Sequence, residues 1–161
     1  MITPQELADA FERNWKVIEI QTEGLAHTDS LLQPPFRGNC LNWVLGHFLE
    51  SRNNVLLTLR ESPLLSEALV KRYCYDSEPV YADGADVLRL ERLLELLRRS
   101  QEVINALLPR LTTEELASNV HDPQGDMTLG QRLFFLYFHE TYHVGQTELL
   151  RQLAGTNDKL I

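Results

Sequence analysis

The sequence of 161 residues has few basic residues and no long apolar run, the features typical of nucleic-acid-binding and membrane proteins. Only 15 Lys and Arg oppose 23 Asp and Glu, and the net charge of −8 offers no basic footprint for nucleic acid or an anionic membrane. No run approaches the roughly 20 consecutive apolar residues of a transmembrane helix. Charges among the N-terminal apolar residues are not typical of a secretory signal. We therefore expect no nucleic-acid partner and no membrane partner.

Cysteine is also scarce, since the chain has only Cys40 and Cys74. They lie far apart and form no CxxC motif, so we interpret them as two free thiols in a reducing, cytoplasmic environment. A packed thiol is the ordinary state of such a cysteine, although Cys40 precedes His47 by two helical turns and could approach a site there. The length and the 43% hydrophobic content fit a single domain over residues 1–161, with a core that needs no disulfide.

Strand signals are sparse too, and only residues 73–81 approach a strand pattern before Pro79 weakens it. Apolar residues at helical spacing, capping motifs, and Gly or Pro stops predict four long helices. Their ranges are about 4–24, 40–62, 85–108 and 128–154. The fold class is therefore all-α, a four-helix bundle with long connections between helices 2 and 3 and between helices 3 and 4. Connections that long are often functional.

Five histidines carry most of the information about function: His27, His47, His121, His139 and His143. His139 and His143 are four residues apart on the fourth predicted helix, so their side chains leave the same face. His47 lies among apolar residues of the second helix, where a buried imidazole needs partners for both ring nitrogens. A metal shared with the other two histidines meets that need, and so does a backbone carbonyl or a water. We expect His27 and His121 to be solvent-exposed.

The segment from His139 to His143 also matches HExxH, which supplies two zinc ligands and a general base in metalloproteases. The extended protease motif fails, because Gly145 comes one residue too early and no further histidine follows. Glu140 and His143 match the ExxH motif of di-iron bundles, but no second ExxH occurs in the chain. The sequence therefore favours a mononuclear site over a di-iron site, and it disfavours a metalloprotease.

Two segments resemble a known family. The sequence NCLNWVLGH at residues 39–47 resembles the second-helix signature of the DinB/YfiT-like superfamily. The sequence HETYHVGQ at residues 139–146, followed by ELLR at residues 148–151, resembles its fourth-helix signature. The resemblance implies a four-helix bundle, often dimeric, that binds one divalent metal ion through three histidines. By motif position these ligands are His47, His139 and His143. Thiol-dependent transferases and isomerases belong to this superfamily.

Three neutral imidazoles leave at least one coordination position open, as in catalytic zinc sites. Such ligands suit zinc, nickel, iron or manganese. The open position could lower the pKa of a bound water or thiol, which favours a metal-dependent enzyme, such as a thiol-dependent S-transferase, with a small-molecule substrate. The alternative is a non-catalytic metal-binding sensor or interaction module, because no general acid or base is evident beside the histidines. Glu50 and Gln146 are candidate partners for the outer ring nitrogens.

The fourth helix carries six consecutive apolar or aromatic residues at positions 133–138. Six residues cover all sides of a helix that has 3.6 residues per turn, whereas a surface helix of a monomer keeps one side polar. The outward aromatics predict a two-fold homodimer packed through this helix. The competing explanation is that the long connection at residues 62–83 folds over these side chains.

Overall fold

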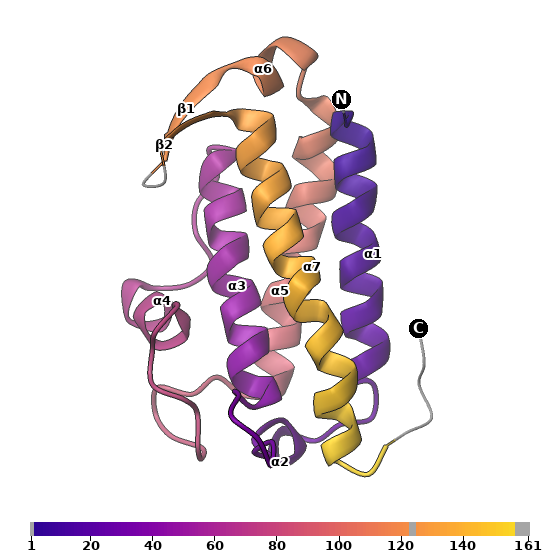
Figure 1. Cartoon of the computed structure of the whole chain (residues 1–161), viewed down its shortest axis with the longest axis vertical. Coiled ribbons are helices and arrows are strands. Elements are labelled where there is room, and N and C mark those ends of the chain that lie inside the picture. Colours follow the sequence, from indigo (N-terminus) through magenta and orange to yellow (C-terminus); the bar gives the residue numbers. More distant parts are fainter. Residues whose placement is uncertain (1, 123–124, 157–161) are drawn as a thin grey trace.

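Four long helices dominate the computed structural model, which describes residues 2–122 and 125–156. They lie side by side, with α3 and α1 each packed against both α5 and α7 (Figure 1). Their bounds are α1 Pro4–Thr22, α3 Leu41–Thr58, α5 Leu90–Leu107 and α7 Leu129–Leu153. The shorter helices are α2 His27–Ser30, α4 Glu67–Tyr73, the 3-10 helix η1 Leu108–Arg110 and α6 Thr113–Ala117. The expectation of a mostly helical, all-α chain is confirmed.

Local capping chemistry sets several helix starts. Thr3 accepts a hydrogen bond from the backbone N–H of Glu6, whose carboxylate accepts from the backbone N–H of Thr3. Thr128 and Gln131 form the same reciprocal pair at the start of α7. Each pair satisfies backbone donors that the first turn of a helix leaves without partners. The predicted starts of α1 and α7 therefore agree with the structure.

Tertiary hydrogen bonds shift the start of α5. The sequence predicts a helix from just after Gly84, but α5 begins at Leu90. The backbone N–H of Leu88 donates to the hydroxyl of Tyr73 at 2.9 Å, and that of Leu90 donates to Nδ1 of His27 at 3.2 Å. In a longer helix these two backbone N–H groups would donate to carbonyls of a preceding turn, but here they donate to side chains. Residues 84–89 therefore lie outside the helix.

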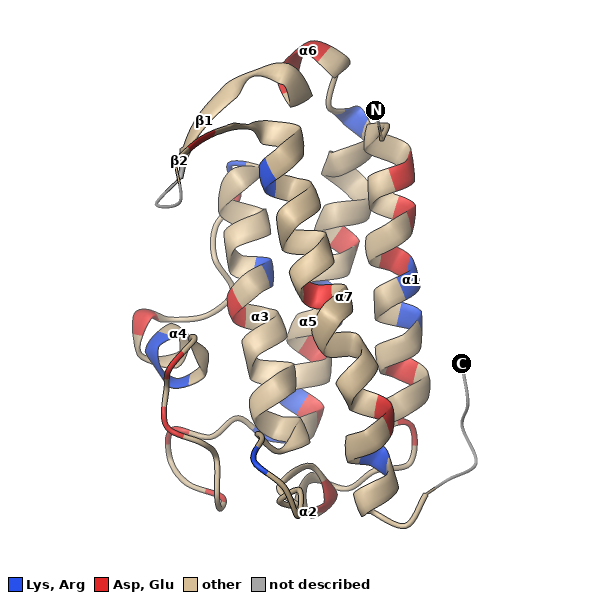
Figure 2. Cartoon of the chain, viewed as in Figure 1, with Lys and Arg blue, Asp and Glu red and all other residues tan. Residues whose placement is uncertain are grey.

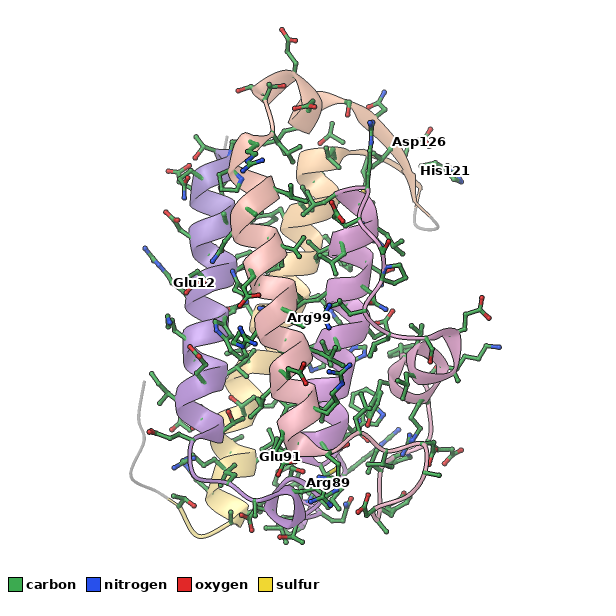
Figure 3. The ribbon with its side chains drawn as sticks, turned by 180° about the vertical axis from the view of Figure 1, so that it is seen from behind. Glu12, Arg89, Glu91, Arg99, His121 and Asp126 are labelled. Atoms are coloured by element: carbon green, nitrogen blue, oxygen red, sulfur yellow. The ribbon has the colours of Figure 1, made fainter. Side chains whose placement is uncertain are left out.

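The connection between α5 and α7 contains a β-hairpin that the sequence analysis did not predict. Strands β1 Asn119–Asp122 and β2 Gly125–Thr128 are antiparallel, with His121 opposite Asp126. The sequence predicts a loop over residues 121–126, of which residues 123–124 lie outside the described residues. Figure 3 shows His121 and Asp126 at the outer end of this hairpin, away from the helices. The strands are too short for alternating hydrophobicity to reveal them.

The apolar core consists of two clusters stacked along the helices. One surrounds Phe48 and Leu97, and the other surrounds Phe11 and Leu133. A buried ion pair of Arg52 on α3 and Glu140 on α7 lies between the two clusters. Within the described part of the chain, none of the helices combines the length and apolar character needed to cross a bilayer.

Candidate metal centre

His47 is held on α3 by contacts at the edge and on one face of its ring. Its Nδ1 donates to the backbone carbonyl of Tyr73 at 2.8 Å, and the Trp43 ring stacks on it with centroids 4.8 Å apart. The Tyr73 ring reaches this position because Gly46 has no side chain: a Cβ there would lie 2.1 Å from the ring. With Nδ1 donating, the lone pair of the neutral imidazole is on Nε2.

His139 and His143 project from adjacent turns of α7, and each has an oxygen beside its outer nitrogen. Nδ1 of His143 lies 2.9 Å from the amide oxygen of Gln146, and Nδ1 of His139 lies 3.4 Å from the hydroxyl of Ser51. The amide oxygen of Gln146 can only accept, so it makes Nδ1 of His143 the donor and leaves the lone pair of that ring on Nε2. The Ser51 hydroxyl can donate or accept, so it orients the His139 ring without fixing its tautomer.

The three predicted histidines meet at one point. One ring nitrogen from each lies within 4.8 Å of those of the other two, and the ring centroids are 4.9–5.1 Å apart. Nε2 of His47 and Nε2 of His139 are separated by 3.2 Å. The inner nitrogens of His47 and His143 carry lone pairs, and that of His139 carries one in the tautomer protonated at Nδ1. A cation between the three rings would accept all three lone pairs, so the donor set fits a metal ion.

Burial favours the neutral form of two of the three histidines. Desolvation, with smaller contributions from the other two histidines, lowers the pKa of His47 from its usual 6.5 to about 4. Desolvation is also the main cause of a lowered pKa at His139, followed by the charge of His143. Neutral imidazoles are the form that binds metals. His47 and His139 are therefore ready to coordinate at neutral pH without first losing protons.

Glu140, the second residue of the HExxH match, points away from the histidines. It is 1% exposed and forms a two-pronged ion pair with Arg52, whose Nε and Nη2 lie 2.7 and 3.0 Å from the carboxylate oxygens. The third Arg52 nitrogen, Nη1, donates to the carbonyl of Leu97 and the hydroxyl of Ser100. A carboxylate fully engaged in this way has no access to a substrate, which argues against protease chemistry.

The other sequence candidates lie in different surroundings. Gln146 contacts His143 as expected, but Glu50 is 3.7 Å from Nδ1 of His47, beyond hydrogen-bond distance, and hydrogen-bonds Asn54. Cys40 is buried, and its thiol contacts the carbonyl of Val80 at 3.2 Å. It is thus packed, as the composition suggested. His121 is exposed, also as expected.

The expectation for His27 is wrong. It opens α2 and is only 3% exposed. Besides accepting from Leu90, its ring places Nε2 3.3 Å from the carboxylate of Asp83. His27 is surrounded by polar residues in the sequence, but two distant segments close over it. It lies outside the three-histidine cluster and serves to hold the start of α5.

A pocket of about 840 Å³ opens beside the cluster. All three histidines line it, together with residues of two loops, 36–39 and 75–79, and of the C-terminal half of α7. This volume lies within the range of small-molecule sites, which is about 300–1,000 Å³. The cluster is therefore accessible to a ligand of moderate size.

Comparisons with known proteins identify a family and a shared fold. The sequence model of the DinB superfamily matches residues 10–147. The chain belongs to the DinB superfamily. A crystal structure described as the conserved protein of a locus from Enterococcus faecalis shares the fold of this DinB superfamily protein, with a TM-score of 0.71 and 18% identity over 97% of this chain and 99% of that one. No curated protein matches the sequence significantly.

Substitution of Gly46 by alanine should destabilise this DinB superfamily protein by about 1–3 kcal/mol, the usual cost of overpacking a core. The new Cβ would overlap the buried Tyr73 ring, whose backbone carbonyl orients His47. Urea unfolding followed by circular dichroism measures the loss. Gly145→Ala on α7 is the matched control, because nothing lies within 4 Å of its added Cβ. Equal stability of the two variants would contradict the proposed close approach.

Proposed function

We propose that His47, His139 and His143 bind one divalent metal ion and that the protein is a metal-dependent enzyme acting on a small molecule, with thiol-dependent S-transfer as the reaction. The observation that carries this proposal is the convergence of three histidine ring nitrogens beside a pocket of about 840 Å³. Three protein ligands leave a position open for a reactant. The pocket supplies the route by which that reactant arrives.

The chain's own residues orient the site and limit access to it. Tyr73 and Gln146 contact the outer nitrogens of two ligands, and Trp43 covers one face of His47. A divalent cation on neutral ligands supplies a positive charge that favours the deprotonated, nucleophilic form of a thiol or water. Zinc, nickel, iron and manganese all accept imidazole. We propose that the four long helices act as a four-helix bundle that keeps the three ligands in register.

The second candidate function is a non-catalytic metal-binding module. It is supported by the state of Glu140, because the one carboxylate in the histidine segment is sealed in an ion pair and cannot act as a general base. Glu50, whose carboxylate lies 3.7 Å from Nδ1 of His47, is another candidate for a general base, and desolvation raises its pKa. A sensor would bind metal with the same ligands but would show no turnover.

Metal analysis and a transfer assay test the proposed function together. Protein purified without an affinity tag should contain about one divalent metal ion per chain. Removal by a chelator should lower the melting temperature by mass action while helical circular dichroism at 25 °C persists, because two apolar clusters form the core without the metal. Loaded protein should accelerate the reaction of cysteine, glutathione or coenzyme A with monochlorobimane. Metal binding without any acceleration would favour the non-catalytic module.

We also propose that the protein forms a two-fold homodimer through α7. Three exposed aromatic side chains of the 133–138 run form a stripe on this helix: Phe134, Phe135 and Phe138. Tyr142 and Leu149 of the same helix are also exposed, and they line the pocket. Phe138 is 58% exposed and Tyr142 is 67% exposed, so the segment at residues 62–83 does not cover them. Its helix α4 packs against α3 instead, as Figure 1 shows. A second copy presenting the same stripe would bury it.

Light scattering at micromolar concentration should give twice the chain mass of 18.5 kDa. Phe138→Glu should shift the protein to the monomer, because a carboxylate at the centre of an apolar interface lacks a partner. Leu57→Glu, at an exposed apolar position of α3, should leave the dimer intact. A wild-type mass of 18.5 kDa would refute the dimer.

We propose a cytoplasmic location and no nucleic-acid partner. The location is supported by two unpaired cysteines. The absence of a nucleic-acid partner is supported by the net charge of −8 and by basic residues that are scattered among acidic ones along the helices in Figure 2. A nucleic-acid interface would concentrate Lys and Arg on one surface.

A further inference from the structure

The pocket beside the histidines has apolar walls and few charges. Its aromatic and aliphatic lining includes Phe36, Trp43, Tyr75, Tyr142 and Leu149. Apart from the histidines, its charged lining consists of Arg37, Asp76 and Glu78. A divalent ion at the histidines would make the balance of charge positive. The pocket therefore suits a ligand with an apolar body and a negative group.

Arg37 is the one cationic side chain among these lining residues. In the part of the chain that the structure describes, it makes no ion pair or side-chain hydrogen bond, and its side chain is exposed. Nearby Arg72 behaves differently, since it pairs with Asp86 at 3.1 Å and donates to the carbonyls of Glu78 and Pro79. A guanidinium presents a planar fork of donors that matches a carboxylate. Arg37 thus offers this fork to the pocket with no internal partner.

The backbone that carries Arg37 is fixed to the opposite side of the pocket. Upstream, the Gln33 amide donates to the carbonyl of Val80 at 2.9 Å. Downstream, the Cys40 thiol contacts the same carbonyl at 3.2 Å. The Trp43 indole adds a third link to this segment, donating to the hydroxyl of Ser77 at 2.9 Å. The two loops at the mouth are therefore tied together, and less conformational entropy is lost when a ligand binds between them.

We propose that Arg37 binds the anionic group of the small molecule that occupies this pocket, and that the ligand is an organic carboxylate with an apolar body. The proposal rests on the proposed function, because it places the other end of the ligand at the three histidines. Arg37 is then a specificity-determining residue. It contacts the ligand at a distance from the reacting group and selects charged over neutral molecules of the same shape.

Cobalt(II)-loaded protein and two matched thiols test this. The probes are 6-mercaptohexanoate and 6-mercaptohexanamide, which share a sulfur and an apolar chain and differ in charge at the far end. Thiolate binding to cobalt produces a charge-transfer absorption band that reports occupancy for both. We expect the wild type to bind the carboxylate roughly 10-fold more tightly than the amide, because charge-assisted hydrogen bonds are the stronger ones.

Arg37→Gln should reduce this preference to less than about twofold and leave the affinity for the amide unchanged, since a neutral side chain loses only the charge-assisted contact. Arg99→Gln is the control, because Arg99 lies on the outward face of α5 in Figure 3 and does not line the pocket. Absence of a preference in the wild type, or its persistence in Arg37→Gln, overturns the role of Arg37. Failure to bind cobalt would instead refute the metal centre itself, and a band with neither thiol from cobalt-loaded protein would refute thiolate binding at that centre and with it the proposed placement of the ligand.

Discussion

Replacing His143 by alanine should weaken metal binding by roughly 100-fold or more, because loss of a ligand's outer partner alone usually costs about 10–100-fold. His143 supplies one of the three nitrogens that lie within 4.8 Å of one another. Two remaining imidazoles hold a divalent ion poorly. Alanine at residue 139 or 47 should have a comparable effect. Elemental analysis of untagged protein, followed by titration of the apo form with Zn²⁺ or Ni²⁺, measures the change.

Two further variants test whether the loss of metal affinity is specific to the histidine cluster. Gln146→Ala removes the oxygen that lies 2.9 Å from Nδ1 of His143, so it should weaken binding about 10–100-fold while the three ligands remain. His121→Ala should leave affinity unchanged, since this histidine is exposed on the hairpin and contacts Asp126. Unaltered metal content in the residue 143 variant would contradict the proposed centre. Loss of metal from the hairpin variant would indicate a different site.

Much of the site could be predicted because its signals are local. A four-residue spacing places His139 and His143 on one helix face, whatever the rest of the chain does. Apolar neighbours place His47 on an inward face, and family resemblance relates the two segments. Likewise, the capping pairs that begin α1 and α7 are satisfied within four residues. These features depend on short-range geometry, which a sequence displays directly.

Other features depend on contacts between distant residues. Tyr73 lies 26 residues from His47, yet its carbonyl sets the tautomer of that ligand. Asp83 and Leu90 close over His27, which the polar surroundings in sequence could not reveal. The contact of Ser51 with His139 was the easiest to predict among those that the sequence analysis missed. Ser51 lies one helical turn after His47 and therefore on the same face of α3. The missed contacts are those that form only when the long connections fold back on the helices.

The Arg52–Glu140 pair gives the second large expected effect. Arg52→Met should reduce the free energy of unfolding by about 3–5 kcal/mol, because it leaves a buried carboxylate without a partner. The residues are 88 positions apart and less than 2% exposed, and all of the Arg52 nitrogens make hydrogen bonds. Each kcal/mol corresponds to roughly 2–4 °C in a protein of this size. Thermal and urea unfolding should therefore both show a pronounced loss.

The double variant Arg52→Met with Glu140→Leu separates an unpaired charge from a general packing defect. Removing both charges should recover most of the lost stability, since apolar replacements of buried ion pairs are often neutral or better. Arg98→Met is the surface control, because its pair with Glu102 is exposed and should contribute less than about 1 kcal/mol. If Arg52→Met costs less than its surface control, the buried pair does not stabilise the fold. The double variant should also keep its metal, because Glu140 points away from the histidines. Loss of metal from this variant would show that the ion pair positions His139.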